Sequence, residues 1–245
     1  MNAGAVIAAL ARHANPSDAV FLQRFFKTGK GQYGEGDVFI GVRVPQTRAV
    51  CKEFKELPLI EVQKLFDSDM HEHRLAAAIL LTYKYPKANA QDREDIYNLY
   101  LKNVRRGRVN NWDIVDTTAP SIVGRQLWDE KLPPGLLFEF AKSDSLWQRR
   151  VALLSSFYFI AKGEPSTSLE LAELLLHDQQ DLIQKAVGWM LREIGKRIDR
   201  KLLLDFLDRH AATMPRTALR YAIEHLPRED KVLYMNMKAS DTRRV

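Results

Sequence analysis

The sequence predicts an all-α protein, a curved α-solenoid in which pairs of helices stack along one domain spanning residues 1–245. Apolar residues recur at helical spacing through most of the chain, and Leu and Ala are plentiful. The connectors between these segments are short and contain Pro, Gly, Asp or Ser, as turns between helices do. Similar segments also recur at a spacing of roughly 30 to 45 residues, which is typical of stacked helix pairs.

The individual elements follow from this periodicity in chain order. The first is an amphipathic helix that ends near Pro16, and Ser17 is the candidate N-cap of the second. The glycine-rich segment 28–37 is expected to be a loop, because it lacks the Gly-Lys-Ser/Thr ending and the preceding strand of a phosphate-binding loop. Residues 38–42 are strand-like without a partner segment, and residues 238–245 are a polar, loose tail. Helices are expected over 2–14, 18–26, 46–54, 58–66, 71–85, 92–101, 112–124, 135–141, 146–161, 169–176, 181–198, 201–210 and 215–225.

One motif repeats along the chain and sets the register of the helix pairs. Arg74, Arg150, Lys185 and Arg216 each precede small and aliphatic residues at the start of the second helix of a pair. Two helices per repeat at this spacing indicate a HEAT-like α-solenoid, whose second helices usually line one face. Ordinary packing explains the Ala and Leu residues, but not the polar and aromatic residues at matching places. The residues expected along one surface are Arg74, Trp112, Asp116, Arg150, Lys185 and Trp189.

Charge and composition limit the class of partner. The chain has 37 Lys and Arg against 31 Asp and Glu, a net charge of +6, which suggests a polyanion without proving one. Cys51 is the only cysteine, so neither a disulfide nor a cysteine-based zinc site is possible, which fits a cytoplasmic location. No stretch has the composition of a signal peptide or a membrane span. His71 and His73 point to different sides of a helix, so neither a metal nor a cofactor is expected.

The stretch 110–116 contains the first candidate site. Residues four apart on a helix are neighbours, so Trp112 and Asp116 share a face while Asp113 points elsewhere. An aromatic surface beside a carboxylate, just after the basic cluster 105–108, suits a positively charged ligand held on a polyanion. Taken alone, the stretch is better explained as an ordinary helix start. Its place in the repeat favours the ligand interpretation and assigns Asp113 to capping or packing.

Two further stretches combine aromatic and basic side chains. Trp147 and Arg150 are neighbours on a helix, although packing between repeats would also explain the tryptophan. A second helix has a stripe of three cations and one Trp; such cations suit phosphates and the Trp suits a base or sugar, but a solvated face explains the stripe equally well. Gly188 within this helix lets another backbone or a ligand come close. The stripe consists of Lys185, Trp189, Arg192 and Lys196.

These motifs together resemble the AlkD-type DNA alkylation repair glycosylases, which are HEAT-like repeat proteins. The matching segments are 112–116, 147–150, 183–193 and 39–45, in order and with the expected gaps, so the resemblance covers nearly the whole chain. It implies excision of positively charged N3- and N7-alkylated purines from double-stranded DNA, by a catalytic Asp116 beside Trp112 and Trp189. The chain is expected to act as a monomer. The cations expected to contact DNA are Arg150, Arg192, Lys185, Arg149 and Arg43.

The sequence departs from the family pattern in two places. Arg43 and Val44 stand where some members have Gln before the proline of the first segment, and Phe25 stands where some have Tyr. Both departures affect the contacts expected with the strand opposite the lesion. They leave the implied catalytic set unchanged.

The chemistry agrees with this resemblance. An alkylated purine is cationic and already a good leaving group, so cleavage needs no protein proton donor if the base departs neutral. Asp116 can stabilise the positive charge that develops on the sugar and orient a water molecule. No lysine is placed for Schiff-base chemistry, which predicts a monofunctional glycosylase that leaves an abasic site.

Two other functions are compatible with parts of the pattern. A non-catalytic HEAT-like protein that recognises bent or branched DNA would use the same cations, but a carboxylate facing DNA repels phosphates unless it takes part in chemistry. A protein-binding scaffold would have the repeat and no salt-dependent affinity for DNA.

Overall fold

The computed structural model describes residues 1–237, and these form an all-α fold. Within them, the strand-like segment 38–42 makes a single isolated bridge, between Val38 and Met70, and no sheet. The predicted fold class is therefore confirmed, with successive helices packed as pairs. The predicted curvature of the array stays a prediction, and the predicted loose tail, 238–245, lies outside the described residues.

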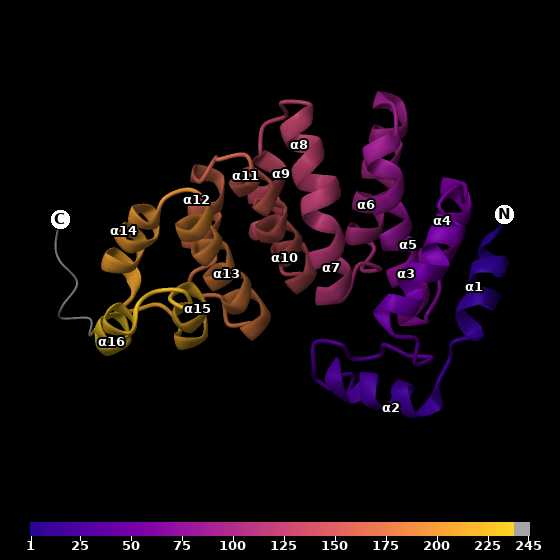
Figure 1. The fold of residues 1–245 in the computed structure, drawn as a ribbon, viewed down its shortest axis with the longest axis horizontal. Helices are drawn as coiled ribbons and strands as arrows, with labels where there is room; N and C mark the ends of the chain where they lie inside the picture. The colour runs from indigo at the N-terminus through magenta and orange to yellow at the C-terminus, as the bar shows by residue number, and fades with distance from the viewer. Residues whose placement is uncertain (238–245) are drawn as a thin grey trace. The chain divides into compact units, whose positions relative to one another are not determined.

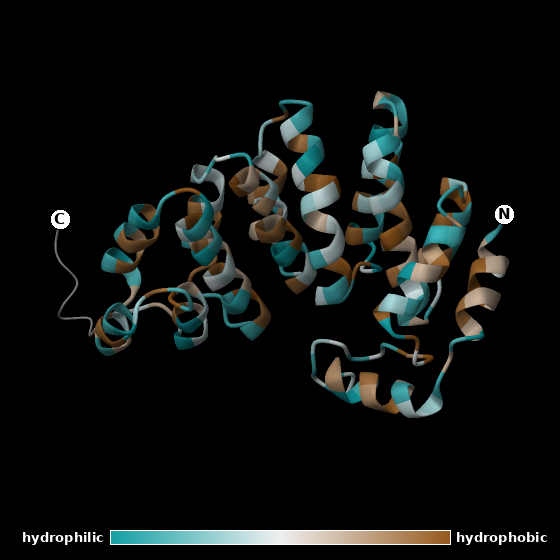
Figure 2. Ribbon diagram, viewed as in Figure 1, coloured by the Kyte–Doolittle hydropathy of each residue, from teal (hydrophilic) through white to brown (hydrophobic). Residues whose placement is uncertain are grey.

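The chain divides into two compact units, one comprising Met1–Gln126 and the other beginning at Leu127. This division does not test the prediction of a single domain, which stays a prediction. Figure 2 shows that helices in both units carry hydrophobic residues on part of their surface and hydrophilic residues on the rest, as helices that pack on one side do.

The first unit is built around one buried helix. Ala76, Ala77 and Ala78 of α5 are fully buried, and their small side chains let α3, α4 and α7 pack closely on several sides. In Figure 1, α2 crosses near the ends of the other helices of this unit instead of lying parallel to them. The elements are α1 (Ala3–Ala11), α2 (Pro16–Phe25), α3 (Val44–Glu53), α4 (Leu59–Phe66), α5 (His71–Lys84), the 3-10 helix η1 (Tyr85–Lys87), α6 (Ala90–Arg105), α7 (Trp112–Ala119), the π-helix η2 (Pro120–Gly124) and α8 (Arg125–Asp129), which crosses into the second unit.

The second unit packs around α13, which contacts α10, α12, α14 and α15. Gly188 of α13 shows why close packing is possible there, because a Cβ atom at this position would lie 2.2 Å from the carbonyl oxygen of Ala218 in α15. The glycine therefore accommodates another backbone. The elements are α9 (Gly135–Ala141), α10 (Leu146–Ser155), α11 (Phe157–Ala161), α12 (Ser166–Leu174), α13 (Asp181–Arg197), α14 (Arg200–His210), α15 (Arg216–Ala222) and α16 (Arg228–Asn236).

The structure corrects the predicted start of the second helix. Asn15, and not Ser17, is its N-cap: the Asn15 Oδ1 atom accepts hydrogen bonds from the backbone N–H groups of Ser17 at 2.9 Å and Asp18 at 3.2 Å. Pro16 takes the first helical position, where its missing N–H group costs nothing.

The predicted helix 146–161 is divided in the structure into α10 and α11. At the junction, the hydroxyl of Ser155 donates to the carbonyl oxygen of Val151 at 2.6 Å, and that of Ser156 donates to that of Leu153 at 2.7 Å. Serine hydroxyls that compete for helix carbonyls in this way interrupt regular winding. The last described helix, α16, was not predicted, and no helix in residues 1–237 is long and apolar enough to cross a membrane.

Candidate functional site

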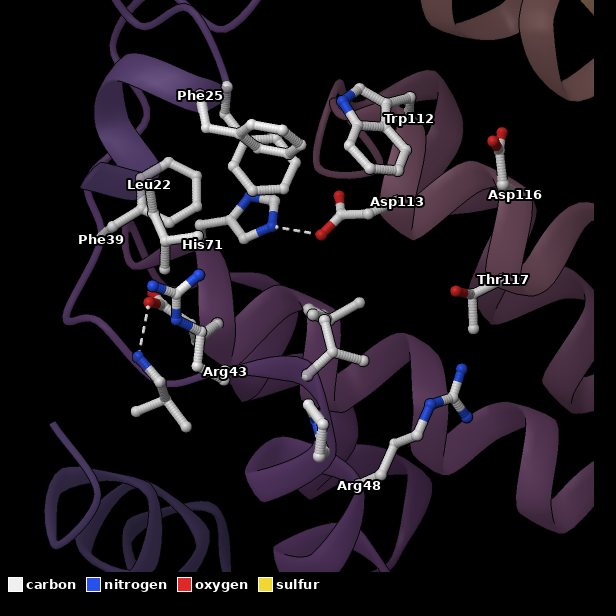
Figure 3. Close-up of a pocket in the computed structure, with 16 residues that line it drawn as sticks. Leu22, Phe25, Phe39, Arg43, Arg48, His71, Trp112, Asp113, Asp116 and Thr117 are labelled. Carbon is white, nitrogen blue, oxygen red and sulfur yellow. Dashed lines mark hydrogen bonds and ion pairs between the residues drawn. The ribbon is translucent and has the colours of Figure 1, made fainter. Parts of the chain in front are cut away.

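A cavity of about 580 Å³ lies in the first unit, beside the start of α7. Its walls come from α2, the segment that leads into α3, α3 itself, α5 and α7 (Figure 3). Aromatic and aliphatic side chains form most of the lining, and a few charged groups converge on it. This combination is typical of ligand sites.

Trp112 and Asp116 both line this cavity from α7, as their helical spacing predicted. Asn111 begins the helix, because its side chain accepts a hydrogen bond from the backbone N–H of Trp112 at 2.9 Å. The side chains of Trp112 and Asp116 are half-buried. The first turn of α7 therefore presents an indole and a carboxylate to the same space.

Packing from α2 fixes the indole. The ring of Trp112 stacks on Phe26 with 5.2 Å between centroids and meets the edge of Phe25 at 6.0 Å. Phe25 is 52% exposed, so an aromatic side chain stands at the open side of the cavity. As a phenylalanine it offers a hydrophobic face and no hydroxyl at this place.

A buried imidazole lies beneath these rings (Figure 3). The Nε2 atom of His71 is 2.8 Å from a carboxylate oxygen of Asp113, and its Nδ1 atom is 3.2 Å from one of Asp37. Burial opposes the charged form, but these two carboxylates outweigh it and raise the pKa of His71 to about 9. Although burial acts in the opposite direction, the hydrogen bond from His71 and the nearby Arg74 hold the pKa of Asp37 below its ordinary value.

Asp113 has the packing role that was predicted for it, although it also lines the cavity. It is buried, and its second carboxylate oxygen accepts the backbone N–H of Ile114 at 2.8 Å. The expectation that its side chain points away from the Trp112 face is thus only partly met. The contact with His71 keeps it at the cavity floor.

Arg74 departs from the expectation that the repeat openings line a surface. It is 2% exposed, forms an ion pair with Asp37, and donates to the carbonyl oxygens of Ser68 at 2.9 Å and Asp69 at 2.8 Å. The guanidinium supplies hydrogen-bond donors that satisfy these carbonyls, and a carboxylate balances its charge in the interior.

Two arginines from the start of α3 also line the cavity. Arg43 is exposed, forms an ion pair with Asp18 at 2.5 Å and lies over the ring of Phe21 at 4.8 Å. Arg48 is half-buried, and Figure 3 shows it on the side of the cavity where Thr117 lies. Arg48 belongs to none of the sequence motifs. The signal available for it was its position three residues after Pro45, about one turn further along α3.

The second unit shows that the repeat register differs by one residue from the predicted one. Arg149, and not Arg150, has the contacts of Arg74, since it donates to the carbonyl oxygens of Ser143 and Asp144, six and five residues earlier, each at 2.9 Å. Gln184 donates to the carbonyl oxygen six residues before it in the same way. Arg149 also forms an ion pair with Asp178 at 2.7 Å.

Arg150 lies in the interior of the second unit. It is 5% exposed, and its guanidinium donates to the carbonyl oxygen of Leu182 at the start of α13. It therefore does not lie on the surface that the sequence predicted. Its role as a DNA anchor stays a prediction.

The predicted stripe on α13 is present but partly neutralised. Lys185 pairs with Asp181 at 2.8 Å, and Arg192 pairs with Glu224 and lies 3.4 Å from Glu193. Trp189 lies beside Phe157 with 6.1 Å between ring centroids. A cavity of about 340 Å³ lies along the end of this stripe, and half of its lining residues are basic: Arg192, Lys196, Arg200 and His225.

The fold and the cavity define an all-α repeat protein whose first unit holds a carboxylate beside stacked aromatic rings, with cations close by. The model of the DNA alkylation repair enzyme family matches residues 6–226, so the chain belongs to this family. It is therefore an enzyme of DNA repair, and its class implies DNA as the partner.

Among solved structures, the chain is similar to a predicted DNA alkylation repair enzyme from Enterococcus faecalis, with a TM-score of 0.69 and 19% sequence identity. The match covers 88% of this chain and 98% of the other. At this identity the likeness supports the fold alone. A comparison with curated protein sequences finds no match.

Proposed function

We propose that this protein is a monofunctional DNA glycosylase that hydrolyses the N-glycosidic bond of cationic N3- and N7-alkylated purines in duplex DNA. The observation that carries this proposal is the position of Asp116 and Trp112 on one wall of an aromatic cavity. In a chain of the alkylation repair family, a carboxylate there needs a chemical reason, because it repels the phosphates of DNA. A cationic lesion supplies that reason.

The reaction breaks the bond between C1′ of the deoxyribose and the purine nitrogen. The bonding electron pair moves to the base, which loses its positive charge and departs neutral, so no general acid is needed. Positive charge develops on the sugar, and the carboxylate of Asp116 stabilises it. Asp116 then orients a water molecule whose oxygen bonds to C1′, and the proton of that water passes to the carboxylate or to solvent.

The aromatic side chains bind and orient the nucleotide in this proposal. Trp112 is held by Phe25 and Phe26, so its position is set before DNA arrives. An indole face beside a cationic sugar or base contributes about 0.5 to 2 kcal/mol. Trp189, in the second unit, is also proposed to contact the DNA, on the strength of the family resemblance.

The phosphate backbone is proposed to be held by cations of both units. In the first unit, Arg43 and Arg48 line the cavity itself. In the second, Lys185 is partly exposed on α13. Arg149 of α10 and Arg192 of α13 complete the proposed set, whereas Arg150, which is buried, belongs to it only on the strength of the family resemblance. We propose that the protein acts as a monomer in the cytoplasm.

The test is release of N7-methylguanine from methylated duplex DNA by the purified protein, followed by chromatography. The expected products are the free base and alkali-labile abasic sites, with no covalent complex trapped by borohydride. Binding of the duplex without base release would instead favour a non-catalytic protein that recognises bent or branched DNA. Absence of salt-dependent binding would contradict both functions and favour a protein-binding scaffold.

A further inference from the structure

His71 connects three parts of the first unit at the floor of the cavity. It stands at the start of α5, and its two ring nitrogens face Asp113 of α7 and Asp37 of the segment between α2 and α3. The imidazole also stacks on Phe39, with 4.4 Å between centroids, and lies against Phe26 at 5.1 Å. Because Phe26 in turn stacks on Trp112, the imidazole supports the ring that lines the site.

The hydrogen bonds define the protonation state of this ring. An ionised carboxylate only accepts hydrogen bonds, so an imidazole bonded to two of them must carry a proton on each nitrogen. Asp37 is held ionised by an ion pair with Arg74 and by donation from the side chains of Asn110 at 2.9 Å and Asn111 at 3.2 Å. With a carboxylate at hydrogen-bond distance from each ring nitrogen and the pKa of His71 raised to about 9, the arrangement favours an imidazolium under the aromatic rings.

The other charged groups around His71 are satisfied locally. Glu72, the next residue of α5, accepts the backbone N–H groups of Ile40, Gly41 and Val42 at distances of 2.8 to 3.2 Å. Arg74 faces Asp37 from the same helix. Glu72 and Asp113 both line the cavity, but backbone N–H groups surround the carboxylate of Glu72, whereas the charged contact of Asp113 among residues 1–237 is with His71.

We propose that His71 is a positioning residue for this site: as an imidazolium, it cancels the charge of Asp113 at the cavity floor and fixes the start of α7, and with it Trp112, against α5. Without that charge, the carboxylate of Asp113 would add uncompensated negative charge, close to Asp116, at a cavity that must accept DNA. The consequence for base release rests on the proposed function. The charge state of His71 and its effect on DNA affinity do not.

The first measurement is the titration of the imidazole ring of His71 by NMR in the wild-type protein, its signals being assigned by their loss in His71→Arg. The ring is expected to stay protonated at pH 8 and to titrate at about 9. A ring that titrates near 6.5, the ordinary value for histidine, would overturn the proposal. This measurement uses only the wild-type fold and does not depend on activity.

The second measurement is affinity for a duplex that carries N7-methylguanine, at low salt. His71→Gln removes the charge and one donor, and is expected to weaken binding about tenfold, equivalent to about 1.4 kcal/mol. Adding Asp113→Asn to that variant removes the carboxylate that has lost its counter-charge and should restore most of the affinity. A purely structural role predicts that the double variant binds no better than the single one, and that result would overturn the proposal.

Conservative and matched variants complete the design. His71→Arg keeps a charge and two donors, so it should retain affinity at pH values where the wild type loses it as the imidazole deprotonates. His73→Gln changes the other buried histidine of α5, which contacts Ser68 at 2.8 Å, and should leave DNA affinity unchanged. Unchanged affinity in His71→Gln would refute the inference. If the titration and the rescue behave as expected but wild type releases no base, the proposed function fails and this inference stands.

Discussion

Replacing Asp116 with Asn is the most direct test of the proposed chemistry. The substitution keeps the volume and planar shape of the side chain but removes its negative charge. Because Asp116 is half-buried at the cavity wall, its packing is expected to survive the change. The variant should therefore fold and bind DNA, while it loses the group that stabilises the cationic sugar.

The magnitude follows from the surroundings of the carboxylate. Two unit charges about 4 Å apart interact by about 4 kcal/mol at an effective dielectric constant of about 20, which suits a site near the protein surface. Partial exposure of Asp116 lowers this to about 2 to 4 kcal/mol. The rate of base release should fall by about 30-fold to about 1,000-fold, at about 1.4 kcal/mol for each factor of ten.

The assay is single-turnover release of N7-methylguanine with enzyme in excess, so that product release does not limit the rate. Asp69→Asn is the matched control, because Asp69 belongs to the same unit and its side chain is 86% exposed. DNA affinity is measured in parallel and should stay the same or increase slightly. A rate for Asp116→Asn within about threefold of wild type would refute the catalytic role of this carboxylate.

Three further predictions follow from the structure. Arg48→Ala should weaken DNA binding for all sequences and lower the slope of log affinity against log salt by about one, as measured by fluorescence anisotropy; an unchanged slope would exclude a phosphate contact. Gly188→Ala should lower the free energy of unfolding by about 1 to 3 kcal/mol in urea, since its Cβ would collide with the carbonyl of Ala218, and unchanged stability would contradict the close packing of α13 on α15. The raised pKa of His71 stabilises the fold below the unfolded value of 6.5, and this contribution is lost as pH rises through about 9. The free energy of unfolding measured in urea should therefore fall more between pH 7 and pH 10 for the wild type than for His71→Gln. Parallel pH dependence in the two proteins would contradict this contribution of His71.

The helical architecture was predictable because local patterns encode it. Apolar residues at helical spacing placed most helices of residues 1–237, although α8 and α16 were not predicted, and several other errors lay at ends, where capping competes with periodicity. The Ser17 and Asn15 example is of this kind, since both residues are good caps and the proline between them decided the choice. The break at Ser155 depended on side-chain hydrogen bonds that periodicity does not show.

The candidate site was predictable in part. The spacing of Trp112 and Asp116 placed both on one face, and they share a cavity wall. The spacing could not show that the cations at equivalent repeat openings, Arg74 and Arg149, donate to backbone carbonyl oxygens, or that Arg150 is buried. Whether such a side chain meets solvent or a carbonyl depends on the neighbouring helix, and the register was therefore wrong by one residue in the second unit.

By itself, the sequence determined the all-α class, the helix pairs and the motifs of the alkylation repair family, because helical periodicity and motif spacing are local properties of the chain. Only the tertiary structure decided that His71 lies between two carboxylates under Trp112, and that Arg48 lines the same cavity. The two carboxylates lie 34 and 42 residues from His71 in the sequence, and the packing that brings them together is set by the shapes of whole helices.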